Sequence, residues 1–340
     1  MSTTVTPEHI MQVGMGFWAS KSLLSAIEIG LFTTLGGDEV SAAELGERLG
    51  LHPRAGTDFL DALVSLGFLD RIGSGHEARY RNTAETGLFL DKHSHAYIGG
   101  MLEMANTRLY GFWGNLTEAL RTGRPQNESK TGGDFFAELY TDEGRLGAFL
   151  AGMQGLQYGN HAAFLEKVDL SGVETFCDVG GANGALCAMV AARYPNLRAI
   201  NFDLPPVGAF ARRHVEAMGV ADRVEVVDGD FLRDKLPVVD VIVLGNVLHD
   251  WDLDHKRLLI DKTYDSLTSG GRLIAIENVI DDDRRHNTFG LLMSLNMLIE
   301  VEGGFDYTGA QFDAWCRDAG FRRTEVVPLA GPGSAAIAYK

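Results

Sequence analysis

The second half of the chain alternates short apolar runs with helical patterns, and this alternation limits the possible folds most strongly. Five runs have the length and the β-branched content of buried strands; from residue 174 onward they are ETFCDVG, RAINFDL, RVEVVDGD, VDVIVLG and RLIAIENVI. Segments with helical spacing, such as ALCAMVAARY, separate them. This order predicts an α/β fold with a doubly wound, mainly parallel sheet. The final stretch, FRRTEVVPLAGPGSAAIAYK, has two strands and no helix between them, so we expect an antiparallel hairpin that completes a seven-stranded sheet.

The first part of the chain has mostly helical spacing, from about residue 8 to 122. Within it, SAAELGERLG predicts a helix with Ser41 as N-cap, Glu44 completing a capping box and Gly50 as the stop signal. A second helix from Pro53 and a hairpin that turns at GSG follow. Helix, helix and hairpin together make a winged-helix pattern.

Winged-helix modules often bind DNA, but the charges here favour a packing or dimerisation module. Residues 38–83 hold eight acidic residues against five arginines, and Asp58 and Asp61 lie on the helix that would enter the major groove. The formal charge of −16 for the whole chain would also repel a phosphate backbone. We therefore expect no nucleic-acid partner.

With 340 residues the chain is long enough for two domains. We expect a helical, winged-helix domain over residues 1–110, a helical linker over 111–170 and an α/β domain over 171–340. The N-terminal stretch lacks the features of a signal peptide, and no apolar run reaches the length of a membrane span of about 18 residues. These features favour a cytoplasmic protein without a membrane partner.

Three cysteines, Cys177, Cys187 and Cys316, are too few and too scattered for a disulfide framework or for zinc ligation by spaced cysteine pairs. We expect them to be reduced and mostly buried.

A glycine-rich turn and an acidic residue suggest an adenosine ligand. The first strand runs into DVGGANG, which places Gly180, Gly181 and Gly184 before a helix. Glycines there permit a tight turn and the approach of a ligand to the helix N-terminus, although such turns also serve packing alone. Asp203 ends the second strand, 23 residues after Gly180, where a carboxylate can accept both ribose hydroxyls.

Asp230 and Phe231 follow the third strand in the sequence GDF. Asp230 could face the adenine edge with Phe231 packed on the ring, but an aspartate in this place is also typical of a helix cap. These features do not separate NAD from S-adenosylmethionine (SAM) as the ligand.

His249 lies just past the end of the fourth strand, in the sequence DVIVLGNVLHDWD, at the edge where such sheets bind ligands. Glu277 ends the next strand and is expected to hold the imidazole in one tautomer. A histidine with an ordinary pKa of about 6.5 is mostly neutral at physiological pH and can act as a general base. The alternatives are a capping role and a metal site, which would use His249 with Asp250, Asp252, Asp254 and His255. The spacing of six residues between the two histidines disfavours shared ligation.

The motifs DVGGANG, FDLP, GDF, LHDW, GGRLIAIE and GGFDYTGAQFDAWCRDAGF occur in this order. With them, nearly the whole chain resembles the SAM-dependent O-methyltransferases of small hydroxylated aromatics, which include plant caffeate-type and bacterial antibiotic-pathway enzymes. The resemblance implies a Rossmann-like, class I methyltransferase domain. It also implies a homodimer whose N-terminal domains help to close each other's substrate pockets, SAM as cofactor, S-adenosylhomocysteine as product, and no metal.

The resemblance assigns the general base to His249 and its acidic supports to Glu277 and Asp306. The family usually has Glu in place of Asp306, and we expect the shorter side chain to reach the histidine through a water. Gly245 stands where plant members carry a lysine, so that cofactor contact is absent or is made otherwise. Cofactor contacts are implied for Asp178, Gly180, Gly181, Gly184, Asp203, Leu204, Asp230, Phe231 and Asn246. Substrate contacts are implied for Trp113, Met153, Asp250, Asn296 and Met297, the first two of them on the helical linker.

The function implied is methyl transfer to a hydroxyl of a polyketide-like or phenolic acceptor in secondary metabolism. Three alternatives remain: a non-methylating enzyme of the same fold that performs hydroxylation, decarboxylation or rearrangement, a DNA-binding regulator, and an NAD-dependent dehydrogenase. The LHDW motif and Glu277 argue against a non-methylating enzyme, and the negative charge of the chain argues against a DNA-binding regulator. The terminal hairpin and the full motif set argue against a dehydrogenase.

Overall fold

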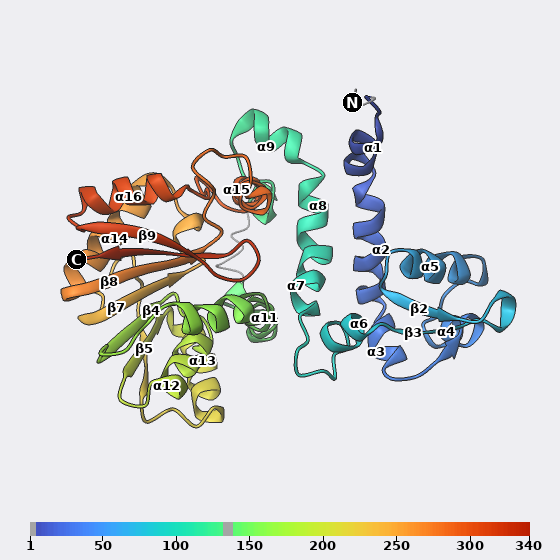
Figure 1. Cartoon of the computed structure of the whole chain (residues 1–340), viewed down its shortest axis with the longest axis horizontal. Coiled ribbons are helices and arrows are strands. Elements are labelled where there is room, and N and C mark those ends of the chain that lie inside the picture. Colours follow the sequence, from blue (N-terminus) through green and yellow to red (C-terminus); the bar gives the residue numbers. More distant parts are fainter. Residues whose placement is uncertain (1–4, 132–138) are drawn as a thin grey trace. The chain divides into compact units, whose positions relative to one another are not determined.

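The computed structural model describes residues 5–131 and 139–340, and the chain divides into two compact units (Figure 1). One unit comprises Met1–Gly111 with Ala151–Gly155, and the other comprises Phe112–Leu150 with Leu156–Lys340. The expected linker is thus shared between the units, and its residues 132–138 lie outside the described residues. The domain boundaries expected from the sequence remain predictions.

The first unit consists of helices and a small three-stranded antiparallel sheet in the order β1-β3-β2. Its elements are α1 (Glu8–Gly14), α2 (Gly16–Glu28), α3 (Leu31–Leu35), β1 (Val40–Ser41), α4 (Ala42–Arg48), α5 (Pro53–Ser65), β2 (Leu69–Ile72), a 3₁₀ turn (Gly75–Glu77), β3 (Arg79–Asn82), α6 (Ala84–Phe89), α7 (Gly99–Met104) and a π-helical turn (Ala105–Leu109). The expected sequence of helix, helix and hairpin is present as α4, α5 and the β2–β3 hairpin.

The capping box predicted for α4 is only half formed. The Ser41 hydroxyl accepts a hydrogen bond from the Glu44 N–H at 3.3 Å, as an N-cap should. The Glu44 carboxylate, however, accepts from the Arg48 guanidinium one turn later instead of reaching back to the N-cap. The prediction of a complete box was therefore wrong, because an i,i+4 ion pair competes for the same carboxylate.

Both acids on α5 interact within the unit. The Tyr80 hydroxyl, which is buried under the hairpin, donates to Asp61 at 2.7 Å, and the Arg71 guanidinium lies 3.3 Å from the same carboxylate. Asp58 pairs with Arg54 on the same helix at 2.6 Å. These contacts give the two acids structural roles.

The chain continues through short helices into one long helix. These elements are α8 (Tyr110–Trp113), α9 (Leu116–Thr122), a 3₁₀ turn (Glu128–Thr131) and α11 (Glu143–Lys167). Asp142 caps the long helix by accepting from the Arg145 N–H at 3.0 Å. Over the described ranges, no helix combines the length and the apolar character that a membrane span requires.

The second unit contains the seven-stranded sheet, in the order β6-β5-β4-β7-β8-β10-β9 (Figure 1). Its elements are β4 (Thr175–Val179), α12 (Ala185–Arg193), β5 (Arg198–Asp203), α13 (Pro205–Ala217), β6 (Val224–Asp228), β7 (Val239–Gly245), a 3₁₀ turn (Leu248–Asp250), α14 (Leu253–Ser266), β8 (Leu267–Glu277), α15 (Thr288–Glu300), α16 (Gly309–Asp318), β9 (Arg323–Pro328) and β10 (Ser334–Tyr339). Neighbours from β6 to β8 are parallel, and β10 is antiparallel to both β8 and β9. The prediction of a mainly parallel sheet with an antiparallel terminal hairpin is confirmed.

Two hydrophobic clusters cover the two faces of this sheet. Strand residues alternate between them, so that Phe176 joins α11, α12 and α13 in one cluster while Cys177 joins α14 and α16 in the other. Continuous apolar strands are needed for burial on both faces, which explains the unbroken runs in the sequence. All three cysteines are buried free thiols, as predicted.

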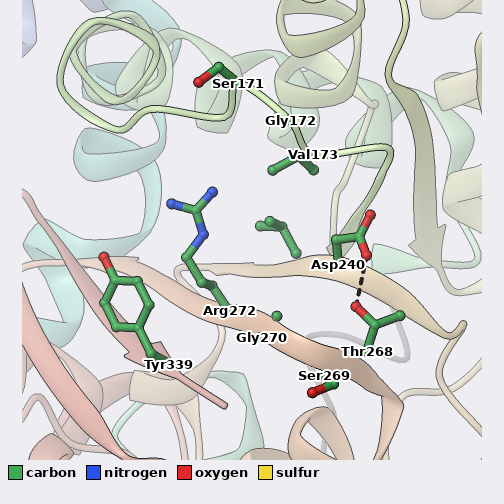
Figure 2. A pocket seen from close by; sticks show the side chains of 11 residues that line it. Ser171, Gly172, Val173, Asp240, Thr268, Ser269, Gly270, Arg272 and Tyr339 are labelled. Atoms are coloured by element: carbon green, nitrogen blue, oxygen red, sulfur yellow. Dashed lines mark hydrogen bonds between the residues drawn. The ribbon is translucent and has the colours of Figure 1, made fainter.

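The amino ends of β4, β7 and β8 border a hollow of about 360 Å³, away from the carboxyl ends of the strands (Figure 2). Asp240 lies in its wall and ties the strands together. Its carboxylate accepts from the Thr175 hydroxyl at 2.9 Å, the Thr175 and Glu174 N–H groups at 2.9 and 3.1 Å, and the Thr268 hydroxyl at 2.7 Å. Burial raises the pKa of Asp240, but these hydrogen bonds lower it more, so the carboxyl pKa lies below its usual range.

Replacement of this carboxylate should destabilise the sheet. We expect Asp240→Ala to lower the free energy of unfolding by about 1–3 kcal/mol, because it leaves several donors at the strand starts without their acceptor. Urea denaturation at pH 7 followed by circular dichroism measures the change. Asp283→Ala, at an exposed loop position, is the control. Equal stability of the two variants would contradict the role of Asp240.

Candidate functional site

The parallel register of the sheet brings the sequence-predicted site residues to one edge. Val179 pairs with Phe202 and Leu244, and Gly245 pairs with Ile276. The residues that follow these positions therefore emerge together at the carboxyl edge, where open α/β sheets bind their ligands. They include Gly180, Asp203, Asn246 and Glu277, with Asp230 just beyond the end of β6.

The three glycines after β4 are required by the packing of the chain itself. A Cβ atom on Gly180 would lie 2.7 Å from the Val247 side chain, and one on Gly181 would lie 2.2 Å from the Asn201 amide oxygen. Gly180 and Gly184 also have φ angles of +74° and +77°, which side chains rarely adopt. The turn is thus tight, and its backbone leads directly into α12.

Asp203 fixes this turn. One carboxylate oxygen accepts from the Ala182 N–H at 2.8 Å, and the other accepts from the Leu204 N–H at 2.7 Å. Ala182 has a φ of +50°, a conformation that is unusual for alanine and that these contacts hold in place. Asn246, at the end of β7, has a φ of +51°. Two non-glycine residues in the left-handed region thus follow neighbouring strands at this edge.

Two buried carboxylates lie beside the turn. Burial raises the pKa of Asp203 to about 6, since its two backbone hydrogen bonds offset the effect only in part. Burial, together with the nearby charge of Asp203, raises the pKa of Asp178 to about 7. Carboxylates that are costly to ionise favour a positively charged ligand, because such a charge would stabilise both of them.

Asp230 closes a turn between β6 and β7. Its carboxylate accepts from the Leu232 N–H at 2.9 Å and lies 3.4 Å from Arg233. Phe231 packs edge to face against Trp251, with 6.0 Å between the ring centroids. No helix lies between β6 and β7 in the described structure, so Asp230 caps a turn and not a helix, and a role of Asp230 and Phe231 at an adenine ring stays a prediction.

His249 is held in a short 3₁₀ turn after β7, and its side chain is 7% exposed. The Glu277 carboxylate accepts from the backbone N–H groups of Val247 and His249, both at 3.1 Å. This oxygen holds the backbone of the turn, and the support of the imidazole that sequence reasoning expected from Glu277 stays a prediction. On the other side, the His249 carbonyl accepts from the Phe305 N–H at 2.9 Å.

The imidazole ring contacts two other carboxylates. Its Nδ1 lies 3.4 Å from Asp306, and its Nε2 lies 3.5 Å from Asp250. The loop brings Asp306 within ion-pair distance of the ring, but no hydrogen bond joins the two side chains among the described residues, so the expected bridge through a water stays a prediction. Gly304 makes this approach possible, since a Cβ there would lie 3.0 Å from the carbonyl oxygens of His249 and Asp250.

The charges around the ring change its protonation. Burial by itself lowers the pKa of His249, but Asp250, Asp306 and Glu277 together outweigh burial and raise that pKa to about 9. Sequence reasoning started from an ordinary, mostly neutral histidine, whereas this imidazole is mostly protonated at pH 7 in the ligand-free protein. It becomes a proton acceptor after it releases this proton, which a nearby positive charge would favour.

Several buried polar atoms at this point lack a hydrogen-bond partner within the described part of the chain. They are His249 Nδ1, Glu277 Oε2, both carboxylate oxygens of Asp306 and the Tyr307 hydroxyl. Unpartnered buried polar atoms are rare in folded proteins, and a cluster of them is typical of a functional site. Across residues 5–131 and 139–340, no group of three or more His, Cys, Asp and Glu side chains is arranged to hold a metal ion.

The residues expected to contact a substrate are only partly brought together. Trp113 on α8 donates from its indole N–H to the Asn296 amide oxygen on α15 at 2.9 Å, and Met297 is buried beside Asn296. Met153 belongs to the stretch Ala151–Gly155 of the other unit, so the structure does not assemble it with these residues. Its role stays a prediction.

Sequence reasoning missed Lys256 and Tyr307. Lys256 is fully buried on α14, among the charged groups of the histidine cluster. A signal was present, because Lys256 shares the spacing of one helix face with Leu259, Ile260 and Thr263, and none of these other three side chains carries a charge. Tyr307 follows Asp306 directly and is 1% exposed.

Two protein-family models match the chain. An O-methyltransferase domain matches residues 113–322, and an O-methyltransferase dimerisation domain matches residues 11–92. Among curated proteins, the tetracenomycin polyketide synthesis 8-O-methyl transferase TcmO of Streptomyces glaucescens is 40% identical, over 98% of this chain and 97% of its own length. The 3-hydroxy-5-methyl-1-naphthoate 3-O-methyltransferase of Streptomyces sahachiroi is 33% identical, over 97% of this chain and 94% of its own.

The fold is also similar to solved structures. Human N-acetylserotonin methyltransferase in complex with SAM has a TM-score of 0.90 and 29% sequence identity, over 100% of this chain and 99% of that chain.

The raised pKa of Asp178 predicts a pH dependence of stability. The pKa of Asp178 is about 7 in the folded chain and about 3.9 in the unfolded chain. Its favourable contribution to the free energy of unfolding is therefore fully present below pH 4 and is lost as the pH rises through 7. We expect the unfolding free energy of the ligand-free wild type to fall between pH 5 and 8 relative to Asp178→Asn, by up to about 1.4 kcal/mol per pH unit. Urea titrations at four pH values measure this difference. Identical pH dependence in both proteins would refute it, and the exposed variant Asp283→Asn should follow the wild type.

Proposed function

Because this chain belongs to the SAM-dependent O-methyltransferase family, we propose that it methylates a hydroxyl of a polyketide-like or phenolic acceptor, with His249 as the general base. The main support for this proposal is the position of His249. It lies at the carboxyl edge of the sheet, with one ring nitrogen at 3.4 Å from Asp306 and the other at 3.5 Å from Asp250.

The relatives support the class of acceptor. One is named for a polyketide and the other for a hydroxylated naphthoate. A fused aromatic ring with a free hydroxyl fits the side chains proposed to line the pocket, because Trp113 and Met297 offer flat and adaptable apolar surface. Asn296 accepts from Trp113 through its oxygen, which leaves its amide N–H groups available to orient an acceptor oxygen. We include Asp250 in this pocket, and a substrate contact of Met153, which belongs to the other unit, stays a prediction from the sequence.

The residues at the strand ends fit SAM. Its cationic sulfonium and amino groups suit an edge where burial makes Asp178 and Asp203 costly to ionise. When bound, SAM supplies an electrophilic methyl group. We propose that the following residues hold it: Asp178, Gly180, Gly181, Gly184, Asp203, Leu204, Asp230, Phe231 and Asn246.

His249 would accept the hydroxyl proton through Nε2, because Nδ1 is fully buried beside Asp306. Asp306 and Asp250 then stabilise the imidazolium, and Glu277 keeps the ring in place by holding the backbone turn. Orientation of the acceptor can contribute about 7–11 kcal/mol to such a reaction, so positioning by Asn296 and Trp113 matters as much as the base. A bound cation also favours the neutral imidazole that the reaction needs.

The first unit presents an apolar surface that suits a second copy of the chain. On α1 and α2, Ile10 is 72% exposed, Val13 67% and Trp18 62%, and Phe17 beside them is also exposed. Monomeric proteins rarely expose such clusters, and the match to a dimerisation domain includes residues 11–92. We therefore propose a homodimer that covers this surface.

The base role predicts both a rate and a pH profile. Removal of the base in His249→Gln should lower kcat/KM by about 10²- to 10⁴-fold with SAM affinity unchanged. In the wild type, kcat/KM should rise about tenfold per pH unit and level off near pH 9, because only the neutral imidazole accepts a proton. Mass spectrometry of hydroxylated naphthoate and polyketide acceptors should show the gain of one methyl group.

The exposed variant His286→Gln controls for the loss of a histidine. Full activity in His249→Gln would refute the base role. A product mass change other than one methyl group would instead support the non-methylating alternative.

The dimer surface can be tested separately. Trp18→Glu should shift the sedimentation coefficient from that of a dimer to that of a single chain, because it places a charge in the apolar contact. Val238→Glu, which is 72% exposed in the other unit, should leave the dimer intact. Equal sedimentation of both variants and the wild type would place the dimer contact elsewhere.

A further inference from the structure

The position of the Asp306 carboxylate depends on the backbone that carries it. Its side chain is 1% exposed, and both of its oxygens lack a hydrogen-bond partner within the described part of the chain. One oxygen lies 3.4 Å from Nδ1 of His249. Because an aspartate has only one methylene group between backbone and carboxylate, the contacts that hold the backbone at Asp306 also set this distance.

The backbone on either side of Asp306 is held by the strand ends. Before it, the Phe305 N–H donates to the His249 carbonyl at 2.9 Å. After it, the Tyr307 carbonyl accepts from the Ile280 N–H at 2.9 Å, just past the end of β8. Both of these bonds join backbone groups, so they do not depend on the identity of a side chain.

The N–H of Asp306 itself is bound by a side chain. It donates to the hydroxyl of Ser294 on α15 at 3.2 Å. Gly290, Ser294 and Met297 follow the spacing of one face of this helix, and the two outer residues are buried. A Cβ atom on Gly290 would lie 2.6 Å from the Asn278 carbonyl oxygen, so this face packs closely against the chain just past β8. The packing of the helix thus fixes the place of the hydroxyl.

The same helix carries two of the side chains proposed to contact the acceptor. The Asn296 amide oxygen accepts from the Trp113 indole N–H at 2.9 Å, and Met297 follows it in the chain. Through Ser294, α15 also binds the loop whose carboxylate contacts the His249 ring. One helix therefore connects the proposed acceptor pocket with the support of the base.

We propose that Ser294 is a positioning residue for the reaction, whose hydroxyl holds the Asp306 backbone so that the Asp306 carboxylate stays beside the His249 ring. This inference rests on the proposed role of His249 as the base. Without the hydroxyl, the Asp306 N–H would lose its acceptor, and the loop would move to find another partner. The carboxylate would move with the loop, and the imidazolium formed in the reaction would lose part of its support.

The carboxylates that act on the ring come from three elements. Asp250 lies on the same 3₁₀ turn, Glu277 ends β8, and Asp306 lies on the loop after α15. All three favour the protonated imidazole, against the effect of burial. Lys256 and Tyr307 interact electrostatically with these carboxylates. Withdrawal of Asp306 alone should therefore lower the pKa of the ring while the other two carboxylates still raise it.

Ser294→Ala removes the hydroxyl and tests this inference. We expect the pKa of His249, followed by NMR of ¹³C-labelled histidine in the ligand-free protein, to fall by about half a unit or more. The rise of kcat/KM with pH should then level off at a lower pH. Its highest level should fall about three- to tenfold, because the base loses part of its support. SAM affinity, measured by calorimetry, should not change, and Ser294→Thr, which keeps the hydroxyl, should titrate like the wild type.

A double variant shows whether Ser294 acts through Asp306. Asp306→Asn removes the carboxylate charge and should itself lower the His249 pKa by about one unit or more. If Ser294 positions this carboxylate, Ser294→Ala should cause no further fall in the Asp306→Asn background. An equal fall in both backgrounds would overturn the proposal, and so would an unchanged His249 titration in Ser294→Ala.

Ser41→Ala is the matched control. The Ser41 hydroxyl also accepts from a backbone N–H, at 3.3 Å, but it lies in the other unit. Its loss should lower stability in urea without moving the His249 titration. The signal of His249 is assigned by its absence in His249→Gln. If His249→Gln retains full activity, the base role fails, yet the NMR titrations still decide whether Ser294 holds Asp306 at the ring.

Discussion

The geometry of the whole site depends on one buried carboxylate at the end of β8. Glu277 is 2% exposed, and one of its oxygens accepts from two backbone N–H groups on either side of Leu248. This arrangement converts the end of β7 into a short turn and delivers His249 to the edge of the sheet. The two bonds satisfy one oxygen of this carboxylate, whereas the same turn without an acceptor would leave two amide groups unsatisfied in the core. The remaining charges, Asp250, Asp306 and Lys256, are arranged around a ring whose place Glu277 has fixed.

Much of the fold was predictable because the sequence repeats simple patterns. Runs such as VDVIVLG are long enough for a strand and apolar on both faces, so they predicted a covered parallel sheet, and the Gly–Pro turn near the end predicted its antiparallel hairpin. Strand ends in a parallel sheet meet at one edge, so the grouping of Asp203, His249 and Glu277 also followed. The complete capping box at Ser41 was not correctly predicted. Glu44 can bond either the N-cap backbone or Arg48, and residue spacing alone does not show which partner it takes.

The details of the site could not be predicted because they depend on loops and charges far apart in sequence. The direct contact of Asp306 with the imidazole requires the close approach that Gly304 permits, and the protonation of the ring results from three carboxylates on three elements. The burial of Lys256 was marked by its place on an apolar helix face, but a lysine there can also extend its ammonium to water. Only the packing of Phe305 against it shows that the charge stays inside.

The reversed strand β10 has a consequence for how the protein is made. Residues 334–339 lie inside the sheet, between β8 and β9, although they are the last strand of the chain. During synthesis, the hydrogen-bonding edge of β8 therefore stays open until β10 has left the ribosome, and β9 has no neighbour before then. Open strand edges pair readily with other chains. The nascent polypeptide is thus exposed to misassembly in the interval between the synthesis of β8 and that of β10.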